Sequence, residues 1–86
     1  MKVFRFGKFY EYDESYAQDG WSNEQILKAA AFFATCKHFN YDEILCYNLS
    51  SMYILLEGNN PSQPELCYEK NHMDLLESIK NRVERA

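Results

Sequence analysis

The chain has 86 residues and a formal net charge of −4, with a pI near 5.0, so one domain covering residues 1–86 is expected. Apolar residues make up 47% and aromatic residues 16%, which excludes a disordered chain, and three cysteines are too few for a disulfide scaffold. No apolar run reaches the roughly 18 residues of a membrane helix, and the first ten residues do not have a signal-peptide pattern, so we expect a cytoplasmic protein with reduced thiols.

Two β-prone runs open the chain, at residues 3–6 and 9–12, separated by Gly7-Lys8. A glycine at the first central position suits a two-residue type II′ turn, and this turn would place Phe6 opposite Phe9. The alternative is one unbroken strand over the same residues. Either way, a β element begins the fold.

A helix over residues 23–38 is the clearest local prediction. Ser22 and Gln25 have the spacing of a capping box, in which each side chain bonds the other residue's backbone amide. Between residues 26 and 36 only Lys28 and Thr35 are not apolar, whereas a surface helix is polar over more than half of its circumference. The helix is therefore expected to be covered on two sides. The second cover is the C-terminal helix, another protein, or a second copy, with a homodimer seam at Ile26, Ala30 and Phe33.

The second half of the chain predicts strands followed by a helix. Residues 43–48 and 52–57 are interpreted as two strands hinged near Ser50-Ser51, because the apolar run 52–56 is typical of a central strand. Residues 58–64 predict a loop and residues 65–68 a short edge strand. Asn71 is expected to cap a last helix over residues 72–85. The fold class is α+β: a hairpin or strand, a long apolar helix, two to three further antiparallel strands and a C-terminal helix, with the helices packed on one face of a small sheet.

No set of residues predicts catalysis, a metal or a cofactor. The Cys and His residues come from separated segments without a Cys-x-x-Cys pair, so the cysteines are interpreted as small buried hydrophobic residues and not as zinc ligands. The serines lack the Gly-x-Ser-x-Gly pattern of a nucleophile elbow, and the three glycines are too far apart to hold a phosphate. The chain is expected to be no enzyme. The candidates considered are Cys36, His38, Cys46, Cys67 and His72 for zinc, and Ser50, Ser51, His38, His72 and Asp74 for nucleophilic catalysis.

Cations alternate with aromatic rings at the N-terminus, as in platforms that bind single-stranded nucleic acid. The alternative function is therefore a single-stranded nucleic-acid-binding domain that uses the hairpin, although the acidic balance of the whole chain opposes it. The residues of this alternative are Lys2, Phe4, Arg5, Phe6, Lys8 and Phe9.

The next segment is acidic, with no cation between residues 11 and 24 and with tyrosines and a tryptophan among the carboxylates. Tyr and Trp are common at interface hot spots, and an acidic surface steers a protein towards a basic partner. The leading hypothesis is a non-catalytic inhibitor that covers a basic surface of another protein, for which a surface that handles nucleic acid is one candidate. The predicted contact residues are Tyr10, Glu11, Tyr12, Asp13, Glu14, Tyr16, Asp19, Trp21 and Glu24.

In size and charge the chain resembles, in general character, small phage-encoded inhibitors of host defence (anti-CRISPR or anti-restriction proteins) and toxin-neutralising immunity proteins. That resemblance implies action by occupying a partner's surface, in the host-cell cytoplasm if the chain is phage-encoded.

Overall fold

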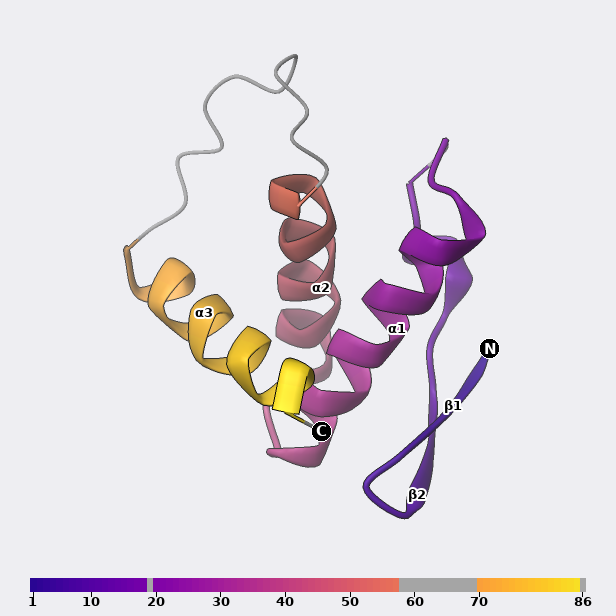
Figure 1. Ribbon diagram of the computed structural model, residues 1–86, viewed down its shortest axis with the longest axis horizontal. Coiled ribbons are helices and arrows are strands. Elements are labelled where there is room, and N and C mark those ends of the chain that lie inside the picture. Colours follow the sequence, from indigo (N-terminus) through magenta and orange to yellow (C-terminus); the bar gives the residue numbers. More distant parts are fainter. Residues whose placement is uncertain (19, 58–69, 86) are drawn as a thin grey trace.

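The computed structural model describes residues 1–18, 20–57 and 70–85, which form an N-terminal antiparallel hairpin and three helices (Figure 1). The predicted α+β class is confirmed at this level, with two strands among the described residues. The elements are β1 (Lys2–Arg5), β2 (Lys8–Glu11), the short 3₁₀ helix η1 (Glu14–Tyr16), α1 (Asn23–His38), α2 (Glu43–Glu57) and α3 (Lys70–Arg85).

The hairpin differs from the prediction in register. Phe4 pairs with Phe9 and Arg5 with Lys8, so the turn residues are Phe6 and Gly7, one position earlier than expected. Their φ values are 54° and 74°. Positive φ at both central positions is the mark of a type I′ turn, whose twist matches that of the strands, whereas the predicted type II′ turn needs it only at the first. The predicted pairing of Phe6 with Phe9 is therefore wrong.

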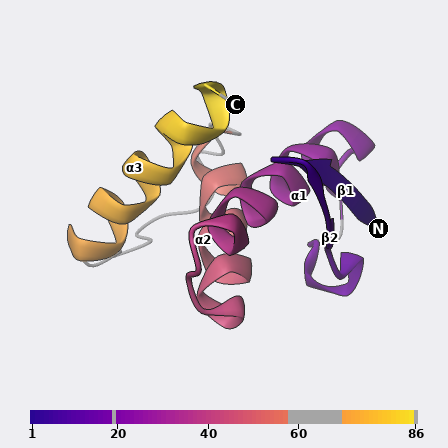
Figure 2. The same cartoon turned by 90° about the horizontal axis from the view of Figure 1, so that it is seen from below.

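Helix α1 follows its predicted bounds and is the centre of the fold. Ser22 Oγ accepts from the Gln25 amide at 3.2 Å and Gln25 Oε1 accepts from the Ser22 amide at 2.8 Å, which confirms the capping box. In Figure 1 the hairpin lies on one side of α1, and α2 and α3 lie on the other; the turned view of Figure 2 has the same order. The two covers expected for this apolar helix thus come from the same chain.

The homodimer seam predicted on α1 is not available. Ala30 and Phe33 are buried inside the single chain, and Ile26 is half-buried against the same core. The physical reason is that α2 and the hairpin already occupy the surface that the seam would have needed.

A tight reversal separates α1 from α2. Asn40 has a φ of 64°, its amide donates to the Lys37 carbonyl, and the Tyr41 amide donates to the Cys36 carbonyl. This is the bond pattern of a Schellman motif, which ends a helix with one residue in the left-handed region. Asp42 then begins α2, since its carboxylate accepts from the Leu45 amide at 3.2 Å.

The two strands predicted over residues 43–57 are a single helix, α2. Leucine, methionine and glutamate, which are good helix formers, make up seven of the fifteen residues of this segment. Its buried residues recur at helical spacing, with Cys46, Leu49 and Tyr53 on one line. A continuous apolar run is compatible with a central strand or with a buried helix, and here tertiary packing on α1 selects the helix.

Helix α3 begins at Lys70, so Asn71 lies inside its first turn and does not cap it as predicted. Leu76 and Ile79 of α3 join the core formed by α1 and α2. The loop and edge strand predicted for residues 58–68 lie outside the described residues. Among the described helices, none has the length and apolar character needed to cross a bilayer.

Candidate functional site

The candidate site is the acidic turn, defined as residues 11–16, which leads from β2 through η1. It carries the carboxylates of Glu11, Asp13 and Glu14 within four positions. The side chains of Glu11 and Glu14 are 67% and 56% exposed, and Asp13 is also exposed. Three acids therefore face solvent on one short segment.

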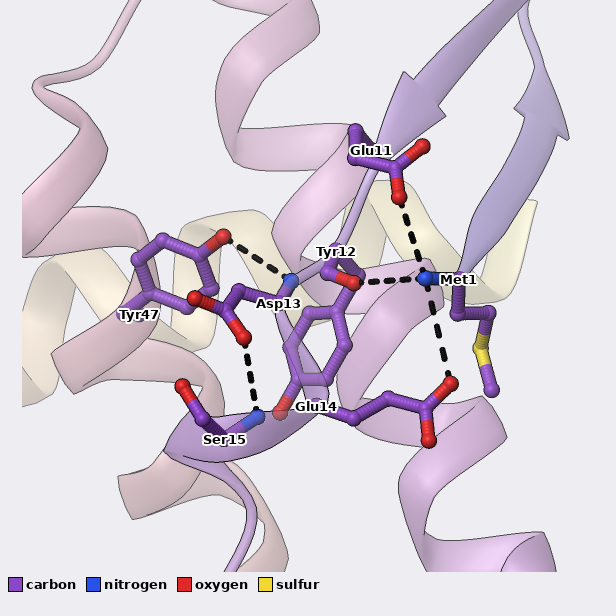
Figure 3. A network of polar contacts seen from close by, with 7 residues as sticks. All are labelled: Met1, Glu11, Tyr12, Asp13, Glu14, Ser15 and Tyr47. Carbon is purple, nitrogen blue, oxygen red and sulfur yellow. Dashed lines mark hydrogen bonds and ion pairs between the residues drawn. The ribbon is translucent and has the colours of Figure 1, made fainter.

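Hydrogen bonds from three directions hold the backbone of the acidic turn (Figure 3). The Asp13 amide donates to Tyr47 Oη of α2 at 3.0 Å. The Ser15 amide donates to Asp13 Oδ1 at 2.9 Å, which caps η1. The N-terminal ammonium donates to the Tyr12 carbonyl at 2.9 Å and lies 3.2 Å from Glu11 Oε1 and 3.8 Å from Glu14 Oε1. One ammonium against three carboxylates leaves a formal charge of −2 on the turn.

Tyr12 fastens the turn to the core and does not face a partner. Its side chain is completely buried, with its ring 5.6 Å from that of Phe33 and 5.6 Å from that of Tyr47. The prediction that Tyr12 contributes to a contact surface is therefore wrong. Tyr12 directly follows the end of β2, where its amide donates to the Met1 carbonyl and continues the extended pairing, so its ring points to the same side as that of Tyr10 while Glu11 points away.

The ionisation of the turn follows from these surroundings. The bonds from Ser15 lower the pKa of Asp13, because they favour the carboxylate over the protonated acid. Burial, with smaller contributions from the charges of Tyr47, Asp13 and Glu14, raises the pKa of Tyr12 to about 12. Burial also raises the pKa of Tyr47. At neutral pH the two phenols are uncharged, and the carboxylates set the charge of the turn.

Tyr16 is the predicted aromatic residue that remains available at the surface of the turn. Its ring stacks on Tyr47 at 3.9 Å and 11°, and 43% of the residue is still exposed. Because the stacked ring has one face supported and the other side open, Tyr16 presents a fixed aromatic surface beside the carboxylates.

The other predicted contact residues lie outside the acidic turn, and the side chains of two of them are partly buried. Tyr10 is half-buried with its hydroxyl 3.1 Å from His38 Nδ1, and Trp21 packs against the core. Glu24 is exposed but lies on α1, 3.9 Å from Lys28 Nζ. Asp19 lies outside the described residues.

The six residues of the nucleic-acid alternative are divided between two places. Phe6 stacks on His38 at 4.0 Å, and Arg5 Nη2 donates to the Val83 carbonyl of α3 at 3.1 Å, so both belong to the packing of the hairpin on the helices. Phe4 and Phe9 are 62% and 70% exposed. Lys2 and Lys8 are exposed as well.

The described cysteines and serines considered for zinc binding or catalysis are buried or half-buried among the helices. Cys36 and Cys46 are buried, and a hydrogen bond between their thiols together with burial raises the pKa of Cys36. Ser50 is buried and donates to the Tyr47 carbonyl at 2.8 Å, while Ser51 is half-buried on α2. Over the part of the chain that is described, no three His, Cys, Asp or Glu side chains converge as metal ligands. Cys67 and the side chain of His72 lie outside that part.

Three residues of the site were missed from sequence: Met1, Ser15 and Tyr47. The Asp13-x-Ser15 spacing is a signal for a local capping turn and could have identified Ser15. Tyr47 could not be identified, because its segment was interpreted as a strand. The chain has no match among protein-family models, curated proteins or solved structures.

Proposed function

We propose that this chain is a non-catalytic interaction protein whose acidic turn docks on a basic surface of another protein and blocks it. The observation that supports this most directly is the exposure of Glu11, Asp13 and Glu14 on one segment. That segment is attached to the core by the buried ring of Tyr12 and by the hydrogen bond to Tyr47.

Holding the turn in one conformation favours binding, because the turn then loses less conformational entropy when a partner binds. Each side chain immobilised at an interface costs about 0.5–1.5 kcal/mol, and a segment that is already ordered avoids part of that cost. The carboxylates add electrostatic steering, which raises the association rate and makes it sensitive to salt. Tyr16 adds a rigid ring of the kind that is enriched in interface hot spots.

A basic surface that normally holds nucleic acid is the kind of partner that suits an acidic turn. Covering such a surface would inhibit the partner without any chemistry by this chain. This mode of action is that of anti-CRISPR, anti-restriction or immunity proteins, to which the chain is similar in size and charge.

The test removes charge from the turn and keeps its geometry. The variant Asp13→Asn/Glu14→Gln keeps an oxygen that accepts from the Ser15 amide, and Asp74→Asn/Glu77→Gln on α3 removes the same charge from exposed positions elsewhere. Affinity capture from cells of the source, followed by mass spectrometry, should identify a basic protein whose retention falls about tenfold with the first variant and is unchanged with the second. Retention that is equal with all three chains at low salt would contradict the proposal.

A single-stranded nucleic acid is the alternative ligand, supported by the exposed rings of Phe4 and Phe9 beside Lys2 and Lys8. It predicts salt-sensitive binding of a fluorescent oligonucleotide, measured by anisotropy, that is lost with Phe4→Thr/Phe9→Thr. The alternative has less support, because Glu11 lies on the same face as the two rings and would repel a phosphate backbone.

A further inference from the structure

We propose that the outer face of the hairpin, defined as Lys2, Phe4, Phe9 and Glu11, is an interface through which two copies of this chain pair face to face. This surface shares Glu11 with the acidic turn but contains neither Asp13, Glu14 nor Tyr16, and the test of the proposed function changes only Asp13 and Glu14, so the proposal does not rest on the proposed function.

Alternation along the two strands separates an inner from an outer face. Val3 and Tyr10, which are paired across the strands, are half-buried on the side of α1. Phe4 and Phe9, also paired, therefore point the opposite way, with their ring centroids 4.9 Å apart. At 62% and 70% exposure they leave roughly 250 Å² of aromatic surface uncovered in one place, close to the lower end of the range for the largest apolar patch of a typical monomer, which is often functional.

The charges on this face complement a second copy of the same face. Lys2 and Glu11 are directly opposite each other across the strands, next to the phenylalanine pair. A two-fold axis parallel to the strands places β1 of one copy over β2 of the other. Lys2 then faces Glu11 of the partner, and Phe4 faces Phe9 of the partner, and each contact occurs twice.

Mixed charge is the reason to favour a second copy over a nucleic acid as the occupant. One cation and one anion on the face cancel, so the face offers little net attraction to phosphates. When the face meets itself, Lys2 gains a carboxylate partner, and Glu11, which already lies 3.2 Å from the Met1 ammonium of its own copy, gains a second cation. The pair would form a small two-layer sheet, with the layers about 10 Å apart as in packed sheets.

The size of the face predicts a weak dimer. Two such faces bury less than the roughly 1,200–2,000 Å² of a standard stable interface. The chain should therefore be monomeric at tens of micromolar and largely dimeric near about 1 mM.

Sedimentation equilibrium over that concentration range tests the proposal. Phe4→Thr/Phe9→Thr should raise the dissociation constant at least about tenfold. Leu27→Ser/Ile44→Ser, which removes two exposed apolar side chains from α1 and α2, should leave it unchanged. Circular dichroism checks that each variant folds. Equal association of all three chains would overturn the proposal, as would a chain that stays monomeric at the highest concentration.

Charge exchange gives a second test that keeps both rings in place. Lys2→Glu alone places two acids against each other in the pair, and Glu11→Lys alone places two lysines against each other, so each variant by itself should associate less than the wild-type chain. A mixture of the two variants restores both opposite-charge contacts and should form a mixed dimer. Association that is no stronger in the mixture than in either variant alone would overturn the two-fold arrangement.

These outcomes are separable from those of the proposed function. Phe4→Thr/Phe9→Thr should weaken self-association and still capture the basic protein through the acidic turn. Asp13→Asn/Glu14→Gln should weaken capture of the basic protein and leave self-association unchanged. Oligonucleotide binding that depends on Phe4 and Phe9 and competes with self-association would overturn the choice of a second copy as the occupant.

Discussion

Phe6 combines an unfavourable backbone conformation with a favourable side-chain contact. A bulky residue with a φ of 54° is a conformational outlier, and the left-handed region costs a non-glycine residue about 1–2 kcal/mol. Its ring stacks on His38 and lies edge-on to Phe39 at 6.1 Å. The contact with the end of α1 offsets the backbone cost and fixes the hairpin turn against the helix.

Two substitutions at Phe6 separate these effects. Phe6→Ala loses the ring and keeps the strained backbone, whereas Phe6→Gly loses the ring and relieves the strain. Both should lower the free energy of unfolding measured in urea, and Phe6→Gly should remain more stable than Phe6→Ala by about 1 kcal/mol. Equal stability of the two variants would mean that the turn carries no strain.

At the same scale, the sequence could predict which residue types occupy the N-terminal segment but not which rings are exposed. Tyr12 and Tyr16 both stand beside acids, yet Tyr12 is buried and Tyr16 is not. The register decides this for Tyr12, because the side chain two positions after an inward-facing strand residue also points inward. With the turn misplaced by one residue, the two faces of the strands could not be assigned.

Among the elements, α1 was predictable because its signals are local. The capping box and the length of its apolar stretch both lie within the segment. Helix α2 was not predictable in the same way, because its continuous apolar run lacks the polar positions that reveal a helical period. The Asp42 side chain at its first turn was a helix signal that the strand interpretation did not use.

The acidic turn depends on α2 through one hydrogen bond, which yields a prediction. Tyr47→Phe removes the acceptor of the Asp13 amide and keeps the ring that stacks on Tyr16. The variant should lose about 1 kcal/mol of stability and show faster hydrogen exchange at the Asp13 amide, with exchange in the middle of α1 much less affected. An unchanged exchange rate at Asp13 would show that Tyr47 does not fasten the turn.

For the whole molecule, the sequence predicted the class and missed the proportion of helix to strand. Both sides of α1 are covered, as expected, but α2 and α3 cover one side where further strands were expected. Because residues 43–57 were interpreted as strands, the predicted fold was a small sheet with two helices, whereas the structure has three helices and a hairpin among its described residues. The homodimer seam was considered for a different reason, since the apolar character of α1 called for a second cover whose source the sequence left open.

Phe33 now has its partners within the chain, and this can be measured. Its ring lies 4.3 Å from Tyr47 and 5.6 Å from Tyr12. Phe33→Ala should cost about 3–5 kcal/mol, a large part of the stability expected for a domain of this size. The loss should be the same at low and at high protein concentration, whereas a dimer seam at Phe33 would make the loss depend on concentration.

The bond from Arg5 to the Val83 carbonyl joins positions 78 residues apart along the chain. Contacts between such distant positions form late in folding, because a long loop must close before they contribute. During synthesis on the ribosome, the hairpin and the end of α1 that Phe6 packs on are both made before α3, so the contact of Phe6 can form early, whereas the bond from Arg5 can form only once the chain up to Val83 has emerged.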